Sequence, residues 1–212
     1  MPTIIAIASQ KGGSGKTTLA VHLATRAAQA GHESCVIDTD PQATAAAWSD
    51  WRGEFLPVVV TAPPARLGRT IESAKKNGVD FLVIDTPPHA DAAAREAIKV
   101  ADVVLVPTRT RAFDLAALEP LADLVTFAKT PAYVVLNAVP AGASVLAEDA
   151  RKAAGALGLA ICPVELGDRA AFHRSSAKGE TASEIDPEGK AAQEVEALWD
   201  WLGQVLQNPK AA

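Results

Sequence analysis

The sequence predicts an α/β protein in which helices cover both faces of a mostly parallel, twisted β-sheet. Short runs rich in β-branched residues alternate along the chain with alanine-rich segments whose apolar residues recur at helical spacing. Proline and glycine gather between these runs, for example in the PP pairs at 63–64 and 87–88, where connections belong. Alternating strands and helices form βαβ units, which place their strands side by side in a parallel sheet.

Seven apolar runs are the expected strands. In chain order they are TIIAIAS (3–9), SCVID (34–38), VVVT (58–61), FLVID (81–85), VVLVP (103–107), AYVVLN (132–137) and LAICPV (159–164). Helical spacing is clearest over 17–30 and 114–128, and a closing helix is expected over 187–208. Neither a repeat nor a linker interrupts the series, so residues 1–212 are expected to form a single domain.

The composition argues against several classes of protein. A net charge of −5 disfavours a surface that is basic throughout, although a local basic patch remains open. Cys35 and Cys162 lie far apart in apolar runs and form no CxxC pair, which is typical of core residues in a reducing cytoplasm. The opening MPTIIAIAS is short and has no basic leader, so we expect neither a signal peptide nor a membrane span.

The strongest motif follows the first expected strand, where the sequence reads QKGGSGKTT and then becomes helical. Glycines let successive backbone N–H groups turn toward an anion, and the start of a helix adds a partial positive charge. Lys16 is then expected to reach the β- and γ-phosphates of a nucleotide, and the Thr17 hydroxyl to bind Mg²⁺. The expected nucleotide contacts are Lys11, Gly12, Gly13, Ser14, Gly15, Lys16, Thr17 and Thr18.

This loop resembles that of the deviant Walker A family of P-loop NTPases, because Gln10 replaces the usual first glycine and Lys11 is added beside it. The family includes ParA-type DNA partition ATPases, MinD-type division-site ATPases and the nitrogenase iron protein. The resemblance implies a single P-loop ATPase domain in which Lys11 crosses a dimer interface to the phosphates bound by the other subunit. A second cation there would stabilise the transition state of phosphoryl transfer, as an arginine finger does. The alternative is a solvated loop lysine.

Carboxylates end two further strands, in Asp38-Thr39-Asp40-Pro41-Gln42 and in Asp85-Thr86-Pro87-Pro88. Two carboxylates at positions i and i+2 point the same way and repel each other unless a cation lies between them. The resemblance to ParA-type proteins implies that Asp38 helps to organise the magnesium site, that Asp40 orients the attacking water and that Asp85 holds Mg²⁺. Asp residues after strands also cap helices, which is the alternative for both segments.

The resemblance covers most of the chain, including 106–118 and 168–180. It places Asn137 where this fold contacts adenine, although an Asn in a tight turn is an equally good interpretation. The match is weaker after the strand at 159–164. Neither cysteine lies in a loop suited to a cluster ligand, which disfavours the iron–sulfur branch of the family.

The closing helix raises the question of membrane binding, because MinD-type relatives end in a membrane-binding amphipathic helix. Its polar side carries Glu194, Glu196 and Asp200, which an anionic membrane would repel. We therefore expect the apolar stripe to pack in the core and no membrane to be bound. The stripe consists of Ala192, Val195, Leu198, Trp199, Leu202, Val205 and Leu206.

The leading hypothesis is a ParA-type ATPase that dimerises on ATP, binds non-specific DNA and segregates a plasmid or chromosome when a centromere-binding adaptor stimulates hydrolysis. ATP and Mg²⁺ are the implied cofactors, and the location is the nucleoid in the cytoplasm. No helix-turn-helix precedes the first strand, so sequence-specific repression is not expected. The alternatives are a positioning ATPase for a protein cargo and a P-loop ligase that acts on a small acceptor.

Non-specific DNA binding requires clustered cations. The candidates are Arg169, Arg174 and Lys178, with Lys129, Arg151 and Lys152 as further possibilities. A solvated face with nearby acidic residues is an equally good interpretation of this cluster.

Overall fold

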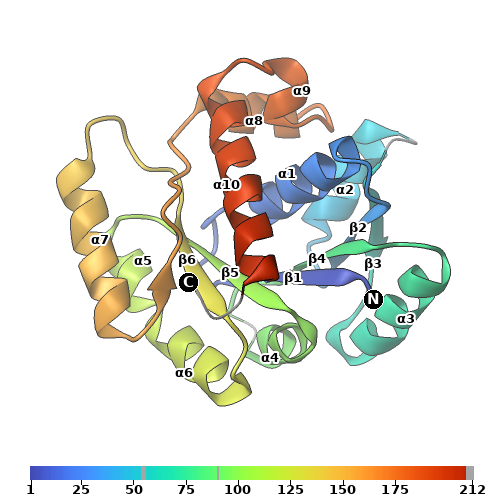
Figure 1. The fold of residues 1–212 in the computed structure, drawn as a ribbon, viewed down its shortest axis with the longest axis horizontal. Helices are drawn as coiled ribbons and strands as arrows, with labels where there is room; N and C mark the ends of the chain where they lie inside the picture. The colour runs from blue at the N-terminus through green and yellow to red at the C-terminus, as the bar shows by residue number, and fades with distance from the viewer. Residues whose placement is uncertain (54–55, 90, 209–212) are drawn as a thin grey trace.

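The structure, a computed structural model, describes residues 1–53, 56–89 and 91–208. Its strands form one parallel sheet in the order β3-β2-β4-β1-β5-β6-β7 (Figure 1). The predicted α/β fold with a parallel sheet is confirmed. The strands are β1 (Thr3–Ile7), β2 (Ser34–Asp38), β3 (Val58–Thr61), β4 (Phe81–Asp85), β5 (Val103–Thr108), β6 (Ala132–Leu136) and β7 (Ala160–Ile161).

Helices connect the strands and cover both faces of the sheet (Figure 1). In chain order they are α1 (Lys16–Gln29), α2 (Thr44–Arg52), the 3₁₀ turn η1 (Pro64–Arg66), α3 (Leu67–Lys76), α4 (Asp91–Val100), α5 (Ala112–Ala116), α6 (Glu119–Ala128), α7 (Ser144–Ala156), α8 (Ala170–Ser176), α9 (Ala182–Ile185) and α10 (Lys190–Gln207).

Two apolar cores lie on opposite faces of the sheet because successive side chains of a strand point to opposite sides. In β1, Ile5 and Ile7 face a core that is completed by α1, α2, α8, α9 and α10. Ala6 faces the other core, which is built with α3, α4, α6 and α7. A strand buried on both faces needs a continuous apolar run, which is the pattern seen in the sequence.

Two predicted elements differ from the structure. The single helix expected over 114–128 is divided into α5 and α6, and Pro120 lies in the first turn of α6. Proline has no N–H to donate and its ring clashes with the carbonyl four residues earlier, so the helix has to restart. The strand expected over 159–164 is reduced to Ala160–Ile161, and Pro163 cannot extend its hydrogen-bond ladder.

The closing helix packs as predicted. Val195, Leu198 and Leu202 are buried in the core shared with α1. Its acidic side is paired within the protein, since Glu194 contacts Arg169 and Glu196 contacts Arg26. In the described ranges, none of the helices has both the length and the apolar character that crossing a membrane would require.

The sheet order places the carboxyl ends of β2, β4 and β1 next to one another. Asp38 at the end of β2 pairs in register with Asp85 at the end of β4, and Ile7 of β1 pairs with Asp85. In parallel sheets, ligands bind in the crevice outside this edge. The phosphate loop and both carboxylate segments therefore meet at one place.

Candidate functional site

The loop between β1 and α1 requires glycine at two positions. Gly13 and Gly15 have φ angles of 70° and 95°, a left-handed conformation that favours glycine. A Cβ atom on Gly15 would also lie 2.0 Å from the Nδ2 atom of Asn137. The loop is thus shaped by both backbone conformation and space, and α1 begins directly after it at Lys16.

Lys16 is a buried cation, with 7% of its surface exposed. Its Nζ donates a hydrogen bond to the carbonyl oxygen of Lys11 at 3.1 Å. Burial lowers the pKa of the ammonium group, and the charges of Asp85 and Asp40 partly offset this effect. A buried ammonium group at the start of a helix is suited to an anionic ligand.

Thr17 and Asp85 form the candidate metal site. The Thr17 hydroxyl donates to Oδ2 of Asp85 at 2.7 Å, while the buried Oδ1 has no partner among the described residues. Burial raises the pKa of Asp85 to about 7, and the nearby charges of Asp38 and Asp40 act in the same direction. A hydroxyl and a carboxylate with an unpaired oxygen are ligands that Mg²⁺ accepts, with water and phosphate oxygens completing its shell. The residues present therefore fit this ion.

Asp38 lies beside Asp85, but its carboxylate also binds the start of α2. Oδ2 accepts hydrogen bonds from the backbone N–H groups of Ala45 at 3.0 Å and Ala46 at 3.2 Å. Oδ1 accepts one from the N–H of Asp40 at 3.0 Å. Burial raises the pKa of Asp38, and these donors counteract the shift. The capping alternative thus describes its contacts here, and its part in the magnesium site stays a prediction.

Asp40 and Lys11 lie at the rim of the same site. Asp40 is half-buried, and its Oδ1 accepts a hydrogen bond from the N–H of Gln42 at 2.9 Å. The negative charge of Asp40 raises the pKa of Lys16, so the two side chains share one electrostatic environment. Lys11 is half-buried and gives Lys16 its carbonyl oxygen.

Asn137 contacts the phosphate loop directly. Its Nδ2 donates to the carbonyl oxygen of Ser14 at 2.7 Å, and its Oδ1 accepts from the N–H of Ala138 at 2.9 Å. The next residue, Ala138, has a φ angle of 49°, as a tight turn requires. The clamp on Ser14 has no signal in the sequence, because the two residues lie in different βα units. Contact with adenine remains a prediction.

A hollow of about 330 Å³ opens beyond Asn137. Its walls come from the loop 139–144 and from the segment after β7, and Glu194 of α10 completes them. The sequence did not identify Gly167 and Glu194 as site residues, since neither belongs to a local motif. The lining residues are Val139, Pro140, Ala141, Gly142, Ala143, Ser144, Glu165, Gly167, Arg169 and Glu194.

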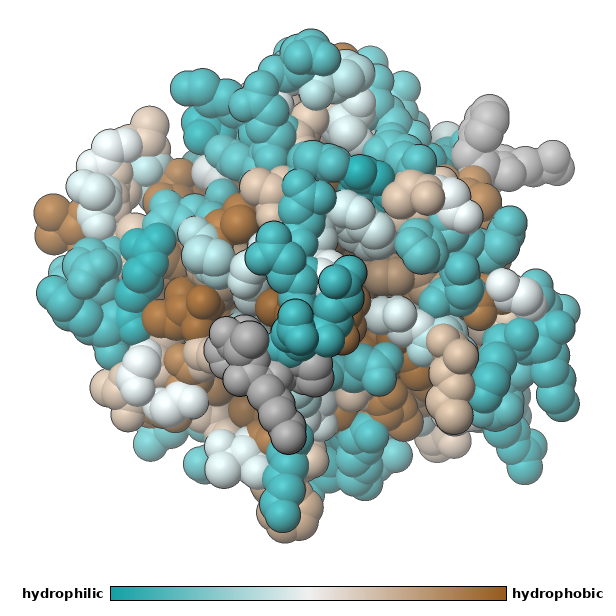
Figure 2. Space-filling model, viewed as in Figure 1, coloured by the Kyte–Doolittle hydropathy of each residue, from teal (hydrophilic) through white to brown (hydrophobic). Residues whose placement is uncertain are grey.

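The candidate DNA-binding cations fall into two groups. Arg169 is ion-paired with Glu194, with 2.7 Å between Nη2 and Oε1, so it is not the free surface cation expected. Arg174 and Lys178 are exposed and form no ion pair with any described residue. Figure 2 shows hydrophilic residues gathered over α8 and α9 at the top of the view. Of the further candidates, Lys129 is exposed, Arg151 pairs with Glu165 and Lys152 pairs with Glu148.

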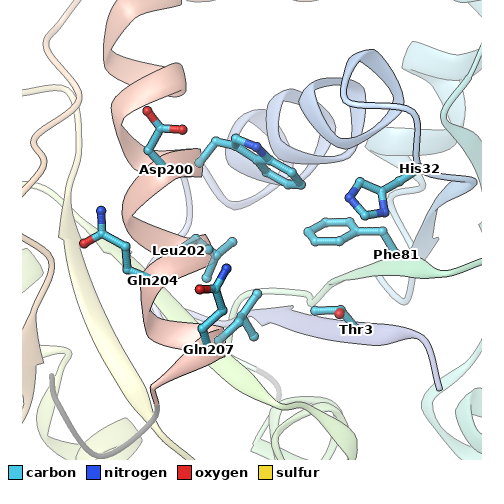
Figure 3. Close-up of a pocket in the computed structure, with 10 residues that line it drawn as sticks. Thr3, His32, Phe81, Asp200, Leu202, Gln204 and Gln207 are labelled. Atoms are coloured by element: carbon cyan, nitrogen blue, oxygen red, sulfur yellow. The ribbon is translucent and has the colours of Figure 1, made fainter.

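A second hollow, of about 420 Å³, lies at the opposite end of the sheet (Figure 3). It is lined by His32, Phe81 and Trp199, whose rings pack against one another, with 5.2 Å between the Phe81 and Trp199 centroids. Thr3 at the start of β1 also lines it. Since it adjoins the amino ends of β1 and β4, it does not reach the phosphate loop.

Comparison with known proteins agrees with this geometry. The family model of the CobQ/CobB/MinD/ParA nucleotide-binding domain matches residues 5–182. The carboxysome distribution maintenance protein A of Gloeobacter kilaueensis is 38% identical over 123 residues, which cover 55% of this chain and 54% of that protein. Protein ParA of Rhizobium radiobacter is 32% identical over 116 residues, which cover 54% of this chain and 51% of that protein. The chain thus spans about half the length of these relatives.

The fold has close counterparts among solved structures. The septum site-determining protein MinD of Pyrococcus horikoshii, solved as a complex with Mg-ADP, has a TM-score of 0.78 and 21% identity. The superposition covers 100% of this chain and 99% of that one. At this level of identity, the likeness is one of fold.

Proposed function

Because the chain belongs to the CobQ/CobB/MinD/ParA family of nucleotide-binding domains, we propose that it is an ATPase whose ATP-bound dimer binds non-specific DNA. ATP and Mg²⁺ are its cofactors, and residues 1–212 act as one domain at the nucleoid in the cytoplasm. The observation that carries the proposal is the buried group formed by Lys16, Thr17 and Asp85, where a cation and an unpaired carboxylate oxygen face the start of α1. Such perturbed charges are typical of functional sites.

Each residue of this group has a separate task in ATP hydrolysis. The loop 12–15 and Lys16 hold the phosphates, and Mg²⁺, held by Thr17 and Asp85 with Asp38 behind them, would neutralise charge on the β- and γ-phosphates. Asp40 orients the attacking water. Lys11 reaches the nucleotide of a second copy, where its charge stabilises the transition state. ATP therefore holds the dimer together, and hydrolysis releases it.

Arg174 and Lys178 are the proposed DNA contacts. They lie at α8 and just beyond it, and their charges are not neutralised by described acidic side chains. Each cation that binds a DNA phosphate releases counterions, so affinity rises with the number of such contacts and falls with salt. A dimer carries two such patches, and simultaneous binding increases the overall affinity.

The test is binding to duplexes of arbitrary sequence with ATP and with ADP. Wild-type protein is expected to bind with ATP, and increasingly weakly as salt rises. The double variant Arg174→Glu/Lys178→Glu should lose this binding and keep its affinity for ATP. Arg66→Glu/Arg69→Glu makes the same charge change at exposed residues of η1 and α3 and serves as the matched control. Equal losses in both variants, or salt-independent binding, would contradict the assignment.

The cargo has two candidates. Relatives named as partition proteins favour a DNA molecule, carried through a centromere-binding adaptor, whereas 38% identity to a carboxysome distribution protein favours a protein assembly. Deletion of the gene distinguishes them: a DNA cargo predicts loss of the replicon that carries it, and a protein cargo predicts clustered assemblies with normal inheritance. ATP consumption that requires a small carboxylic acid would indicate a ligase instead.

A further inference from the structure

We propose that Arg169, held in place by Glu194, is the platform on which the base of the bound nucleotide stacks, and that it takes no part in the DNA-binding surface. The inference rests on the proposed nucleotide-binding function. It assigns the hollow beyond Asn137 to a flat, uncharged heterocycle.

The order of the sheet fixes the direction in which a nucleotide must lie. The phosphate loop follows β1, and the carboxylates Asp38 and Asp85 follow β2 and β4 on one side of it. A magnesium-bound γ-phosphate belongs on that side. The base must then extend the other way, past β5 toward the ends of β6 and β7. The hollow lined by the loop 139–144 lies there.

Hydrogen bonds connect the phosphate loop to this hollow without a break. Asn137 donates to the carbonyl oxygen of Ser14, and the chain continues from Asn137 into the wall of the hollow. The N–H of Val139 donates to the carbonyl oxygen of Leu166 at 3.0 Å, and the N–H of Asp168 donates back to that of Val139 at 2.9 Å. The two loops are therefore fixed relative to each other and to the phosphates.

Arg169 is held flat against one wall. Its Nε and Nη2 atoms donate to Oε1 of Glu194 at 3.1 and 2.7 Å, and Oε2 of Glu194 accepts from the N–H of Gly167 at 2.9 Å. A Cβ atom on Gly167 would lie 2.6 Å from Nε and 2.7 Å from Cζ of Arg169. Glycine at position 167 thus allows the guanidinium group to lie directly on the backbone.

The charges around the hollow favour a base over a phosphate. Glu194 is paired with Arg169, and Glu165 is paired with Arg151, so both cations are neutralised where they stand. A DNA phosphate would have to compete with these carboxylates. The face of a guanidinium group, in contrast, remains able to stack on an aromatic ring while its edge is hydrogen-bonded.

The test compares two ligands that share their phosphates and differ in the base. Calorimetry measures the Kd of ADP and of inorganic pyrophosphate, both with Mg²⁺, for wild type, Arg169→Ala and Arg169→Lys. Both variants should weaken ADP binding about tenfold, since lysine keeps the charge but not the planar group. Pyrophosphate binding should change less than twofold. Arg174→Ala, the matched control on α8, should change neither.

Two further measurements keep the outcome decisive if Arg169→Ala folds poorly. Gly167→Ala should displace the guanidinium group and weaken ADP binding without affecting pyrophosphate. Arg169→Lys at saturating ATP should bind DNA as wild type does. Unchanged ADP binding in these variants, or equal loss of ADP and pyrophosphate, would overturn the proposal. Wild-type protein that binds no ADP would instead refute the proposed nucleotide function.

Discussion

At its carboxyl ends the sheet buries charge, and at its amino ends it buries aromatic rings. Lys16, Asp38 and Asp85 are each less than a tenth exposed, and they meet at the carboxyl edge. At the other edge, His32, Phe81 and Trp199 pack around the second hollow. That hollow, of about 420 Å³, is slightly larger than the one beside Asp38 and Asp40, of about 390 Å³. Size therefore does not distinguish the two ends, whereas the unpaired charge does.

The physical reason is that a buried charge is unfavourable unless a partner compensates for it. The unpaired Oδ1 of Asp85 and the raised pKa of its carboxyl show that the carboxyl edge is only partly compensated by the protein itself. The aromatic rings of the other edge gain stability from packing alone. A ligand has more to contribute at the first edge, and the predictions below test this contrast.

The largest effect is expected at Lys16. Lys16→Ala removes the direct cation of the phosphates in a partly dry site, at a cost on the order of several kcal/mol, so ATP binding should be lost. Trp199→Ala is the matched substitution at the amino edge. It should lower the melting temperature, because Trp199 packs on Phe81, and leave the Kd of ATP unchanged. Calorimetry and thermal unfolding measure both. Equal loss of ATP binding in the two variants would break the contrast.

The next effect concerns Asp40 within the carboxyl edge. Asp40→Ala should retain ATP, because Lys16, the loop and Mg²⁺ supply the ground-state contacts, and should lower turnover by about a hundredfold or more. Steady-state ATPase rates and nucleotide affinity separate the two properties. A variant that turns over ATP at the wild-type rate would remove Asp40 from the mechanism.

The smallest effect compares Lys16 with another buried group on the same helix. His22 is 2% exposed, and its Nε2 accepts the N–H of Ala182 at 3.0 Å, so the proton lies on Nδ1, which donates to the carbonyl oxygen of Thr18. Burial lowers the pKa of His22 to about 4, against the donor bond to Thr18 and the charge of Glu184. This histidine is fully paired, and its role is expected to be structural.

The sign of the pH dependence follows from that pKa. Between pH 6.5 and about 4 the unfolded chain binds a proton at His22 that the folded chain does not, so stability falls as the pH is lowered through this window. The loss should reach about 3 kcal/mol near pH 4. Urea unfolding at several pH values measures it. His22→Gln should flatten the curve, and an equally steep curve in that variant would place the titration elsewhere.

Local patterns account for the parts of this protein that the sequence predicts correctly. The apolar runs that end at Asp38 and Asp85 become β2 and β4, and the glycines before Lys16 become a left-handed turn. In each case the pattern is a consequence of neighbouring residues, which sequence periodicity records. Even the break between α5 and α6 has a local cause in Pro120, which the helical spacing over 114–128 concealed.

Contacts between distant segments were beyond such patterns. Nothing near Arg169 in the sequence indicates that Glu194 will neutralise it, and nothing near Asn137 indicates the bond to Ser14. For Asp38, the sequence allowed both a metal role and a helix cap, and only the fold shows α2 starting at its carboxylate. These pairings depend on how the elements pack, so they appear only in three dimensions.

The central claim is that the charged edge holds ATP between two copies of the chain. Light scattering of Asp40→Ala, which should retain ATP unhydrolysed, tests it directly. The account predicts the mass of a dimer with Mg²⁺ and ATP, the mass of a monomer with ADP, and a monomer in both cases once Lys11→Ala is added. A monomeric mass for Asp40→Ala saturated with ATP, or an ATP-dependent dimer that survives Lys11→Ala, would contradict the claim.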